Sequence, residues 1–202
     1  MAGKKFDIYL VGVGGQGVLT IADILTRAAV QQDIPVNDYP TKGMAQRGGF
    51  VKVQLRIGSE AVGPDISERG ADLVIATEQS EALKAVRFLK KGGEFLLYEN
   101  RWNPAAVMLG RAPYPALETV TNEIKAAGGK AICLSAADRP SFGGKPVRDN
   151  IYVLGALFGH TKLSEIFPAE EIETLLKERW PKAAEANAFT FEAGRAARTA
   201  LA

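Results

Sequence analysis

The sequence of 202 residues contains very little cysteine and histidine, with one residue of each. A single cysteine, Cys133, excludes an internal disulfide and leaves the chain unable to hold an iron–sulfur cluster by itself. Its apolar surroundings, KAICLS, predict a buried thiol on a strand, and this cysteine usage is typical of a cytoplasmic protein. The one histidine, His160, has no cysteine, histidine or carboxylate cluster beside it, so we expect a capping or interface residue and no metal site.

The sequence also lacks an excess of charge and any long apolar run. Lysine and arginine number 25 against 23 for aspartate and glutamate, which gives no argument for a nucleic-acid partner or a membrane surface. The apolar stretch 151–159 falls well short of the ~18 residues of a membrane span, and the start, MAGKK, has no signal-peptide pattern. With 47% hydrophobic and 24% charged residues the composition is that of a globular protein. The length favours a single domain, 1–202, with a helical extension from about 161.

Short β-branched runs alternate with helical patterns in the first half of the chain, which is typical of a parallel α/β sheet. We therefore predict an α/β, Rossmann-like fold, with a mainly parallel central sheet flanked by helices and a helical C-terminal region. The apolar and polar residues of 50–58 alternate, which indicates a strand with one face open to solvent or covered by a partner. The expected strands are 6–12, 34–38, 50–58, 71–77, 94–100 and, as the last, 130–135. The expected helices include 16–31, 116–129 and 78–93, the last capped by its two final glycines.

The stretch VGVGGQGV, between the first expected strand and helix, carries a glycine pattern. Gly12, Gly14 and Gly17 satisfy G-x-G-x-x-G, in which glycine lets the backbone turn sharply and approach a pyrophosphate at the helix N-terminus. Asp38 follows where a dinucleotide-binding protein places its ribose acid. One alternative is thus a stand-alone NAD(P)- or FAD-binding oxidoreductase. Another is that the glycines only allow close packing of strand and helix.

A polar loop, YPTKGMAQRGG, follows Asp38 and carries two cations, Lys42 and Arg47, among its glycines. Two cations and three glycines are more than the recognition of an adenosine ribose requires. Flexible backbone beside two cations suits phosphate recognition, because arginine binds phosphate through a fork and lysine as a point charge. The alternative is a solvated turn with two incidental charges.

The tandem of GVGGQGVLTIADIL and KGMAQRGGFVKVQLRIG resembles the gamma-type component of the 2-oxoacid:ferredoxin oxidoreductases, most closely the beta subunit of the indolepyruvate enzymes. ADLVIATEQSEALKAVRFLKKGG and NIYVLGALFG extend the resemblance over most of residues 6–160. It implies a pyruvate/ketoisovalerate oxidoreductase gamma-type domain in a hetero-oligomer that oxidatively decarboxylates an indolepyruvate-like or arylpyruvate-like 2-oxo acid to an acyl-CoA. Thiamine diphosphate, magnesium and iron–sulfur clusters are then expected on a large catalytic partner, which passes electrons to ferredoxin or another acceptor. This chain would supply no catalytic residue and no activity alone.

The resemblance also implies a ligand for the two motifs. In the family the equivalent domain contributes to coenzyme A binding, and the basic loop is part of that contact. CoA would therefore be a co-substrate at the subunit interface, with its phosphates near Lys42, Arg47 and the glycine turn. The predicted binding residues are Gly12, Gly14, Gly15, Gln16, Gly17, Lys42, Gly43, Arg47 and Gly48.

One departure from the family pattern concerns the basic loop. Relatives usually carry a Ser-Glu-Val-His-like stretch before GMAQRGG, whereas this sequence has DYPTK, so that Lys42 stands in place of a histidine. The lysine adds fixed positive charge beside the predicted phosphate site. The substrate stays open: an arylglyoxylate-specific member of the family, or one for another aryl or branched 2-oxo acid, is also compatible.

A few further residues are candidates for interfaces, ligands or caps. Trp102 and Phe142 are aromatic residues in expected loops, where such side chains often anchor an interface. Glu78 and Glu99 lie near the ends of expected strands, at the edge where open α/β sheets bind ligands, although packing or solvation explains them equally well. Ser80 and Glu81 open an expected helix, where capping is their expected role.

Overall fold

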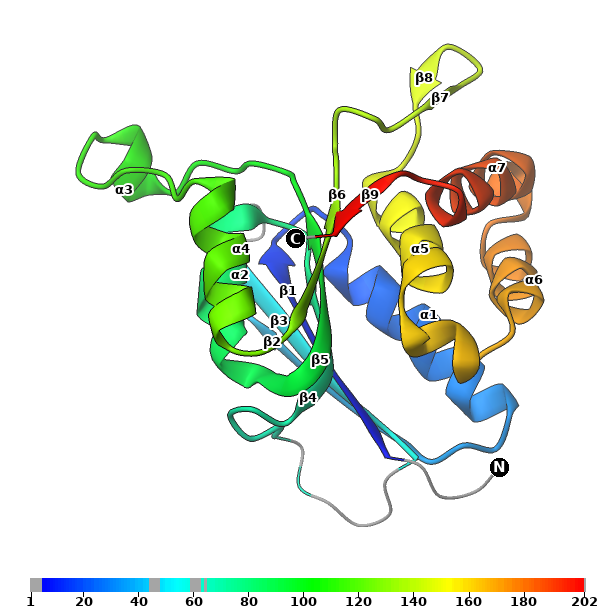
Figure 1. Cartoon of the computed structure of the whole chain (residues 1–202). Helices are drawn as coiled ribbons and strands as arrows, with labels where there is room; N and C mark the ends of the chain where they lie inside the picture. The colour runs from blue at the N-terminus through cyan, green and yellow to red at the C-terminus, as the bar shows by residue number, and fades with distance from the viewer. Residues whose placement is uncertain (1–4, 44–47, 59–62, 64, 202) are drawn as a thin grey trace.

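The computed structural model describes residues 5–43, 48–58, 63 and 65–201. A seven-stranded sheet, in the order β2-β3-β1-β4-β5-β6-β9, forms its centre, and helices cover both faces (Figure 1). The strands are β1 (Phe6–Val13), β2 (Val36–Lys42), β3 (Phe50–Ile57), β4 (Ala71–Ala76), β5 (Leu89–Tyr98), β6 (Lys130–Leu134) and β9 (Thr199–Leu201), and β7 (Ser141–Phe142) and β8 (Lys145–Pro146) form a separate hairpin. The helices are α1 (Val18–Gln31), α2 (Gln79–Ala85), α3 (Ala105–Met108), α4 (Leu117–Ala126), α5 (Asp149–His160), α6 (Ala169–Arg179) and α7 (Ala184–Arg195), with 3-10 turns η1 (Val86–Phe88), η2 (Lys162–Glu165) and η3 (Pro181–Ala183).

The middle of the sheet is parallel and its margins are antiparallel. β1, β4, β5 and β6 run in one direction, whereas β3 pairs antiparallel with both β1 and β2, and β9 pairs antiparallel with β6. The predicted α/β class with a mainly parallel sheet and a helical C-terminal region is therefore confirmed. The expectation that 130–135 forms the last strand is wrong, because the chain returns after α7 to add β9 beside it. The division into one domain with a helical extension stays a prediction.

Each face of the sheet is buried under its own helical layer. α1, α5, α6 and α7 cover one face, and α2 and α4 cover the other (Figure 1). Within β1, Ile8 and Leu10 belong to the first core, and Tyr9 and Val11 belong to the second. A strand that is buried on both sides is apolar at every position, which is why FDIYLVGV reads as a nearly continuous apolar run. None of the helices in the described part of the chain has the length and apolar character that a membrane crossing requires.

The apolar helix α5 packs against α7 at very short range. A Cβ placed on Gly155 would lie 2.0 Å from the carbonyl oxygen of Phe191, and one on Gly194 would lie 2.2 Å from that of Tyr152. Only glycine permits this approach of the two backbones. Ile151–Phe158 is buried throughout, so the apolar stretch of α5 belongs to the core.

The segment 78–93 departs from its expected structure. The helix α2 ends at Ala85, η1 follows, and β5 begins at Leu89. Gly92 has a φ of +77° and donates its N–H to the carbonyl of Gly128, 2.8 Å away, so the glycine pair bends a strand and does not cap a helix. The pairing of β4 with β5 shifts register at this point. Periodicity misled here because the apolar residues of a short helix and of the following strand run together at helical spacing.

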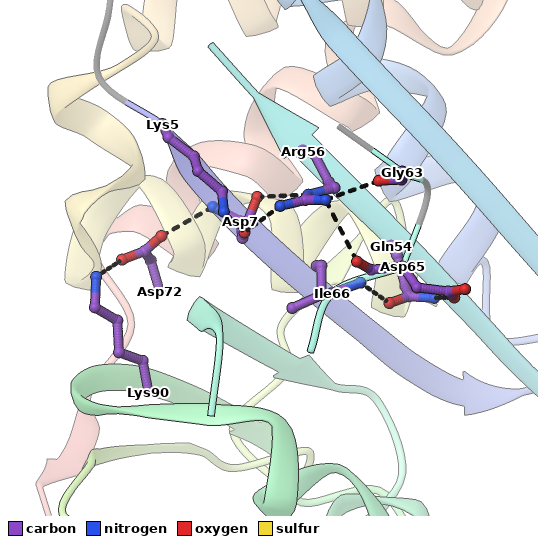
Figure 2. A network of polar contacts seen from close by, with 9 residues as sticks. All are labelled: Lys5, Asp7, Gln54, Arg56, Gly63, Asp65, Ile66, Asp72 and Lys90. Atoms are coloured by element: carbon purple, nitrogen blue, oxygen red, sulfur yellow. Dashed lines mark hydrogen bonds and ion pairs between the residues drawn. The ribbon is translucent and has the colours of Figure 1, made fainter. Parts of the chain in front are cut away.

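The polar face of β3 is covered by the chain itself, which corrects the expectation of a solvated or partner-covered face. Gln54 is 2% exposed and Arg56 is 7% exposed. Gln54 accepts the N–H of Ile66 at 2.7 Å and donates to the carboxylate of Asp65 at 2.8 Å (Figure 2). Arg56 donates to the carbonyl of Gly63 at 2.7 Å. These contacts attach Gly63, Asp65 and Ile66 to the sheet.

Arg56 also forms a buried ion pair with Asp7 of β1. The guanidinium donates from Nε to Oδ1 at 3.1 Å and from Nη2 to Oδ2 at 3.3 Å, and Lys5 Nζ lies 2.9 Å from Oδ2 (Figure 2). Asp7 is 1% exposed, so its charge depends on these partners. The pair joins the two strands side by side at the register Asp7↔Arg56.

We expect Arg56→Met to lower the free energy of unfolding by about 3 kcal/mol, because it leaves the Asp7 carboxylate buried with a single exposed lysine as partner. Urea denaturation measures the change. The matched control is Arg27→Met, which removes an exposed pair with Asp23 and should cost less than about 1 kcal/mol. Equal losses in the two variants would contradict the structural role of the buried pair.

Candidate functional site

The glycine stretch forms a strand–turn–helix corner at the carboxyl end of β1. β1 ends at Val13 and α1 begins at Val18, with Gly17 as its N-cap residue. Gly15 and Gly17 have φ values of +101° and +78°, a region that glycine adopts without strain. A Cβ on Gly15 would meet no atom of the described residues within 4 Å.

Gly12 lets the turn pack against the neighbouring strand β4. A Cβ on Gly12 would lie 1.9 Å from Thr77 Oγ1, which follows the last residue of β4. The Thr77 hydroxyl donates to Gln16 Oε1 at 2.7 Å, and the N–H of Val13 donates to the same oxygen at 3.0 Å. The amide oxygen of Gln16 thus fixes the turn between β1 and β4. Its Nε2 is buried and has no partner among the described atoms.

The turn is bonded directly to the end of the basic loop. Gly14 donates its N–H to the carbonyl of Gly49 at 2.7 Å, and Gly48 donates to the carbonyl of Gly14 at 3.2 Å. The predicted loop begins later than expected, because β2 continues to Lys42 and residues 39–42 pair with β3. Gly43, which follows β2, donates to the carbonyl of Phe50 at 2.7 Å. The two motifs that are separate in the sequence therefore meet at one edge of the sheet.

The predicted binding residues divide into three groups. The glycine turn and Gly48 are in contact, and Gly43 lies at the base of the same loop, directly after the strand end at Lys42. Arg47 lies outside the described residues. The N–H of Gly14 is already bonded to Gly49, so it is not a ready donor to a ligand. The α1 N-terminus, in contrast, receives no hydrogen bond from a capping side chain among the described residues, which leaves its first N–H groups available.

The sheet order contradicts the dinucleotide interpretation of Asp38. In that arrangement the second strand lies beside the first, at the crevice where the nucleotide binds. Here the antiparallel strand β3 lies between β1 and β2, and Asp38 is the third residue of β2, paired with Leu55. Asp38 is therefore two strands away from the glycine turn and cannot act as its ribose acid.

Glu78, next to Thr77, is a fully buried carboxylate that organises the loop after β5. Its Oε2 accepts the N–H of Glu81 at 2.9 Å and the hydroxyl of Ser80 at 2.6 Å. Its Oε1 accepts the backbone N–H of Trp102 at 3.1 Å and the hydroxyl of Tyr114. Glu78 is thus the cap of α2, a role that was expected of Ser80. Burial, followed by the hydrogen bond to Glu78, raises the pKa of the Tyr114 phenol.

We call residues 101–115 the arm. It carries the short helix α3 and extends away from the sheet and its helical layers (Figure 1). At its base, Trp102 lies against the basic loop: a Cβ on Gly48 would be 2.8 Å from the indole Nε1. The guanidinium of Arg101 stacks on Tyr114, 4.2 Å from the ring centroid. The base of the arm therefore lies beside Gly48, which is hydrogen-bonded to the glycine turn.

The other candidate residues from the sequence do not contact the glycine turn or the described end of the basic loop. Cys133 is buried, as predicted, and burial raises the pKa of its thiol to about 11. Burial, followed by the charge of Asp138, raises the pKa of Glu99. The ring centroid of Phe142 lies 5.2 Å from that of Phe189, and its role as an interface anchor stays a prediction.

His160 ends α5, as expected of a capping position, with Nδ1 3.5 Å from the hydroxyl of Thr199. Within the described ranges no three His, Cys, Asp or Glu side chains come together as a metal site would require. A hollow of about 140 Å³ is lined by residues that include 90–94 and Lys162. A second, of about 340 Å³, is lined by residues that include Tyr152 and Arg198. Neither is lined by a residue of the glycine turn.

Comparison with known proteins identifies the family. The sequence matches the family described as pyruvate ferredoxin/flavodoxin oxidoreductase over residues 7–197. The chain belongs to this family. The indolepyruvate oxidoreductase subunit IorB of Archaeoglobus fulgidus is 37% identical over 174 residues, which are 86% of this chain and 85% of the relative. The prediction of a gamma-type subunit of a 2-oxoacid:ferredoxin oxidoreductase is confirmed, and the stand-alone dinucleotide enzyme finds no support.

Solved structures share the fold. The crystal structure of pyruvate oxidoreductase subunit PORC from Thermotoga maritima matches with a TM-score of 0.72 at 24% identity, over 98% of this chain and 99% of that one. A 2-oxoglutarate:ferredoxin oxidoreductase from Magnetococcus marinus, solved with 2-oxoglutarate, coenzyme A and succinyl-CoA, matches with a TM-score of 0.66 at 18% identity. The match covers 96% of this chain but 31% of that one. In that protein the same fold is one part of a much longer chain.

We expect Glu78→Gln to destabilise the protein by about 2 kcal/mol, because the amide presents a donor where the carboxylate accepts four hydrogen bonds. The arm should also become more sensitive to trypsin at Arg101 and Arg111. Thermal unfolding and limited proteolysis measure the two effects. The control is Glu123→Gln on the exposed face of α4, expected within about 0.5 kcal/mol of the parent. An arm that is cleaved no faster in Glu78→Gln than in this control would show that Glu78 does not hold it.

Proposed function

We propose that this chain positions coenzyme A in an oxidoreductase complex that converts a 2-oxo acid to its acyl-CoA. One observation carries the proposal: the hydrogen bonds between Gly14 and the Gly48–Gly49 pair join the glycine turn to the end of the basic loop. A site for the phosphates of CoA then combines open N–H groups at the start of α1 with the charges of Lys42 and Arg47.

The chemistry of this edge suits an anionic ligand. The helix α1 is 14 residues long and its N-terminus carries positive potential, and among the described residues it has no side-chain cap hydrogen bond. Lysine and arginine add charge that persists at neutral pH. The solved neighbour from Magnetococcus marinus contains coenzyme A, which supports CoA over other phosphate ligands.

The role proposed for this chain is positional. Holding the CoA phosphates fixes where its thiol lies, and a fixed thiol reacts with the acyl group faster than a freely diffusing one. No proton transfer by this chain is needed. Thiamine diphosphate on the partner would supply the decarboxylation chemistry.

The rest of the machinery is proposed to lie on a larger catalytic subunit, which would hold thiamine diphosphate, magnesium and iron–sulfur clusters and deliver electrons to ferredoxin or another acceptor. The one cysteine of this chain is buried, and its raised thiol pKa disfavours the thiolate that ligates iron. The name of the Archaeoglobus relative supports indolepyruvate or a similar aryl 2-oxo acid as substrate of the complex.

In the assembled enzyme, Lys42→Ala and Arg47→Ala should each raise the KM for CoA about 10-fold, because a charge-assisted phosphate contact contributes about 1.4 kcal/mol or more. The kcat at saturating CoA should stay unchanged, since the contact is the same in the ground state and the transition state. Steady-state kinetics with varied CoA measure both.

The matched control is Lys91→Ala, which removes an exposed lysine at the opposite edge of the sheet. It should leave the KM for CoA unchanged. The KM should also rise less steeply with ionic strength in the Lys42 and Arg47 variants than in the parent, because they have lost part of the screened attraction. An unchanged KM in both variants, with assembly intact, would refute the CoA assignment and favour a purely structural role for the turn.

A further inference from the structure

The arm presents an unusual amount of apolar surface to solvent. Met108 is 76% exposed, Leu109 is 63% exposed and Trp102 is 47% exposed. These are three of the six large apolar side chains that are exposed in the described part of the chain, and α3 buries no residue at all. Met108 and Leu109 are adjacent in the sequence, and exposed apolar residues that gather in this way mark an interaction site.

Hydrogen bonds nevertheless fix the arm where it leaves and rejoins the body, and also within α3 and the residues after it. Gln79 donates its backbone N–H to the carbonyl of Asn100 at 3.2 Å and its side-chain amide to that of Pro115 at 2.8 Å. Arg111 closes the tip by donating to the carbonyl of Ala106 at 2.8 Å. Together with the bonds to Glu78, these contacts keep the apolar tip projecting from the body. A preorganised element loses less conformational entropy on binding than a flexible one.

The arm is basic as well as apolar. Arg101 and Arg111 are exposed, and no acidic residue occurs between Glu99 and Glu118. A surface that accommodates the arm therefore has to combine an apolar pocket for Met108 and Leu109 with an acidic rim for the two arginines. A second copy of the arm does not meet this requirement, because a symmetric contact would place the arginines near one another.

We infer that the arm docks the chain onto the catalytic subunit of the complex, with Met108 and Leu109 inserted in an apolar pocket that has an acidic rim. This inference rests on the proposed function for the identity of the partner. Its position supports it: Trp102, at the root of the arm, touches Gly48 of the loop that is proposed to bind CoA. A subunit that receives the acyl group beside this loop has to cover the same edge, and in the Magnetococcus protein this fold belongs to a chain that is about three times longer.

The test uses the complex purified through a tag on the catalytic subunit. Met108→Glu/Leu109→Glu should weaken retention of this chain at least ~30-fold, because central apolar anchors carry most of the binding energy and the new charges meet an acidic rim. Met108→Ser/Leu109→Ser should weaken it less. Val30→Glu on α1, whose parent side chain is 62% exposed, is the matched control and should be retained normally.

Two further measurements make the result decisive. The thermal unfolding of the isolated variants should match that of the parent, since Met108 and Leu109 are exposed. Arg101→Glu/Arg111→Glu should weaken retention most at low salt. Undiminished retention of the Glu and Ser double variants would overturn the inference, as would a change only in self-association of the isolated chain.

The inference and the proposed function fail in different ways. Lys42→Ala and Arg47→Ala should assemble normally and alter only the KM for CoA. Normal assembly of the arm variants with a raised KM in the loop variants would overturn the docking role alone. Lost assembly of the arm variants with an unchanged KM in the loop variants would support docking and refute the CoA assignment.

Discussion

The antiparallel pairing of β3 with β1 determines what the glycine turn can do. Along this pair, Val13 at the end of β1 lies opposite Phe50 at the start of β3. The loop between β2 and β3 consequently returns to the sheet beside the turn, where Gly48 and Gly49 bond to Gly14. A parallel neighbour in this position would send the loop elsewhere. The phosphate-binding proposal follows from the direction of β3, and the rejection of a dinucleotide site follows from its position between β1 and β2.

The stability of that pairing depends on charge buried at its other end. Asp7 and Arg56 face one another on β1 and β3, and Arg56 also donates to the carbonyls of Gly63 and Asp65. A buried pair of this kind contributes little net free energy relative to apolar residues, but a shift of register would leave both charges unpaired. It thus acts mainly against misaligned pairings of the two strands, and correct alignment is what brings the loop to the turn.

Sequence reasoning succeeded where the signal is local. Glycines followed by a helical pattern predicted the corner after β1, and apolar runs located most strands of the sheet. It failed where partners are distant in the chain. The alternation in β3 is the same whether water or the chain's own Gly63 and Asp65 cover Arg56. Likewise, nothing in the sequence near Asp38 indicates that β3 lies between β1 and β2. Glu78 was recognised as a strand-end carboxylate, but its partner Tyr114 lies 36 positions later.

Thr77 and Glu78, consecutive residues after β4, connect the glycine turn to the arm. The Thr77 hydroxyl bonds to Gln16 in the glycine turn, and the Glu78 carboxylate holds the backbone of Trp102 at the root of the arm. A displacement of this backbone moves both contacts together. If docking of the arm changes the affinity of the turn for its ligand by some factor, thermodynamic linkage requires that the ligand change the affinity of the arm for its partner by the same factor.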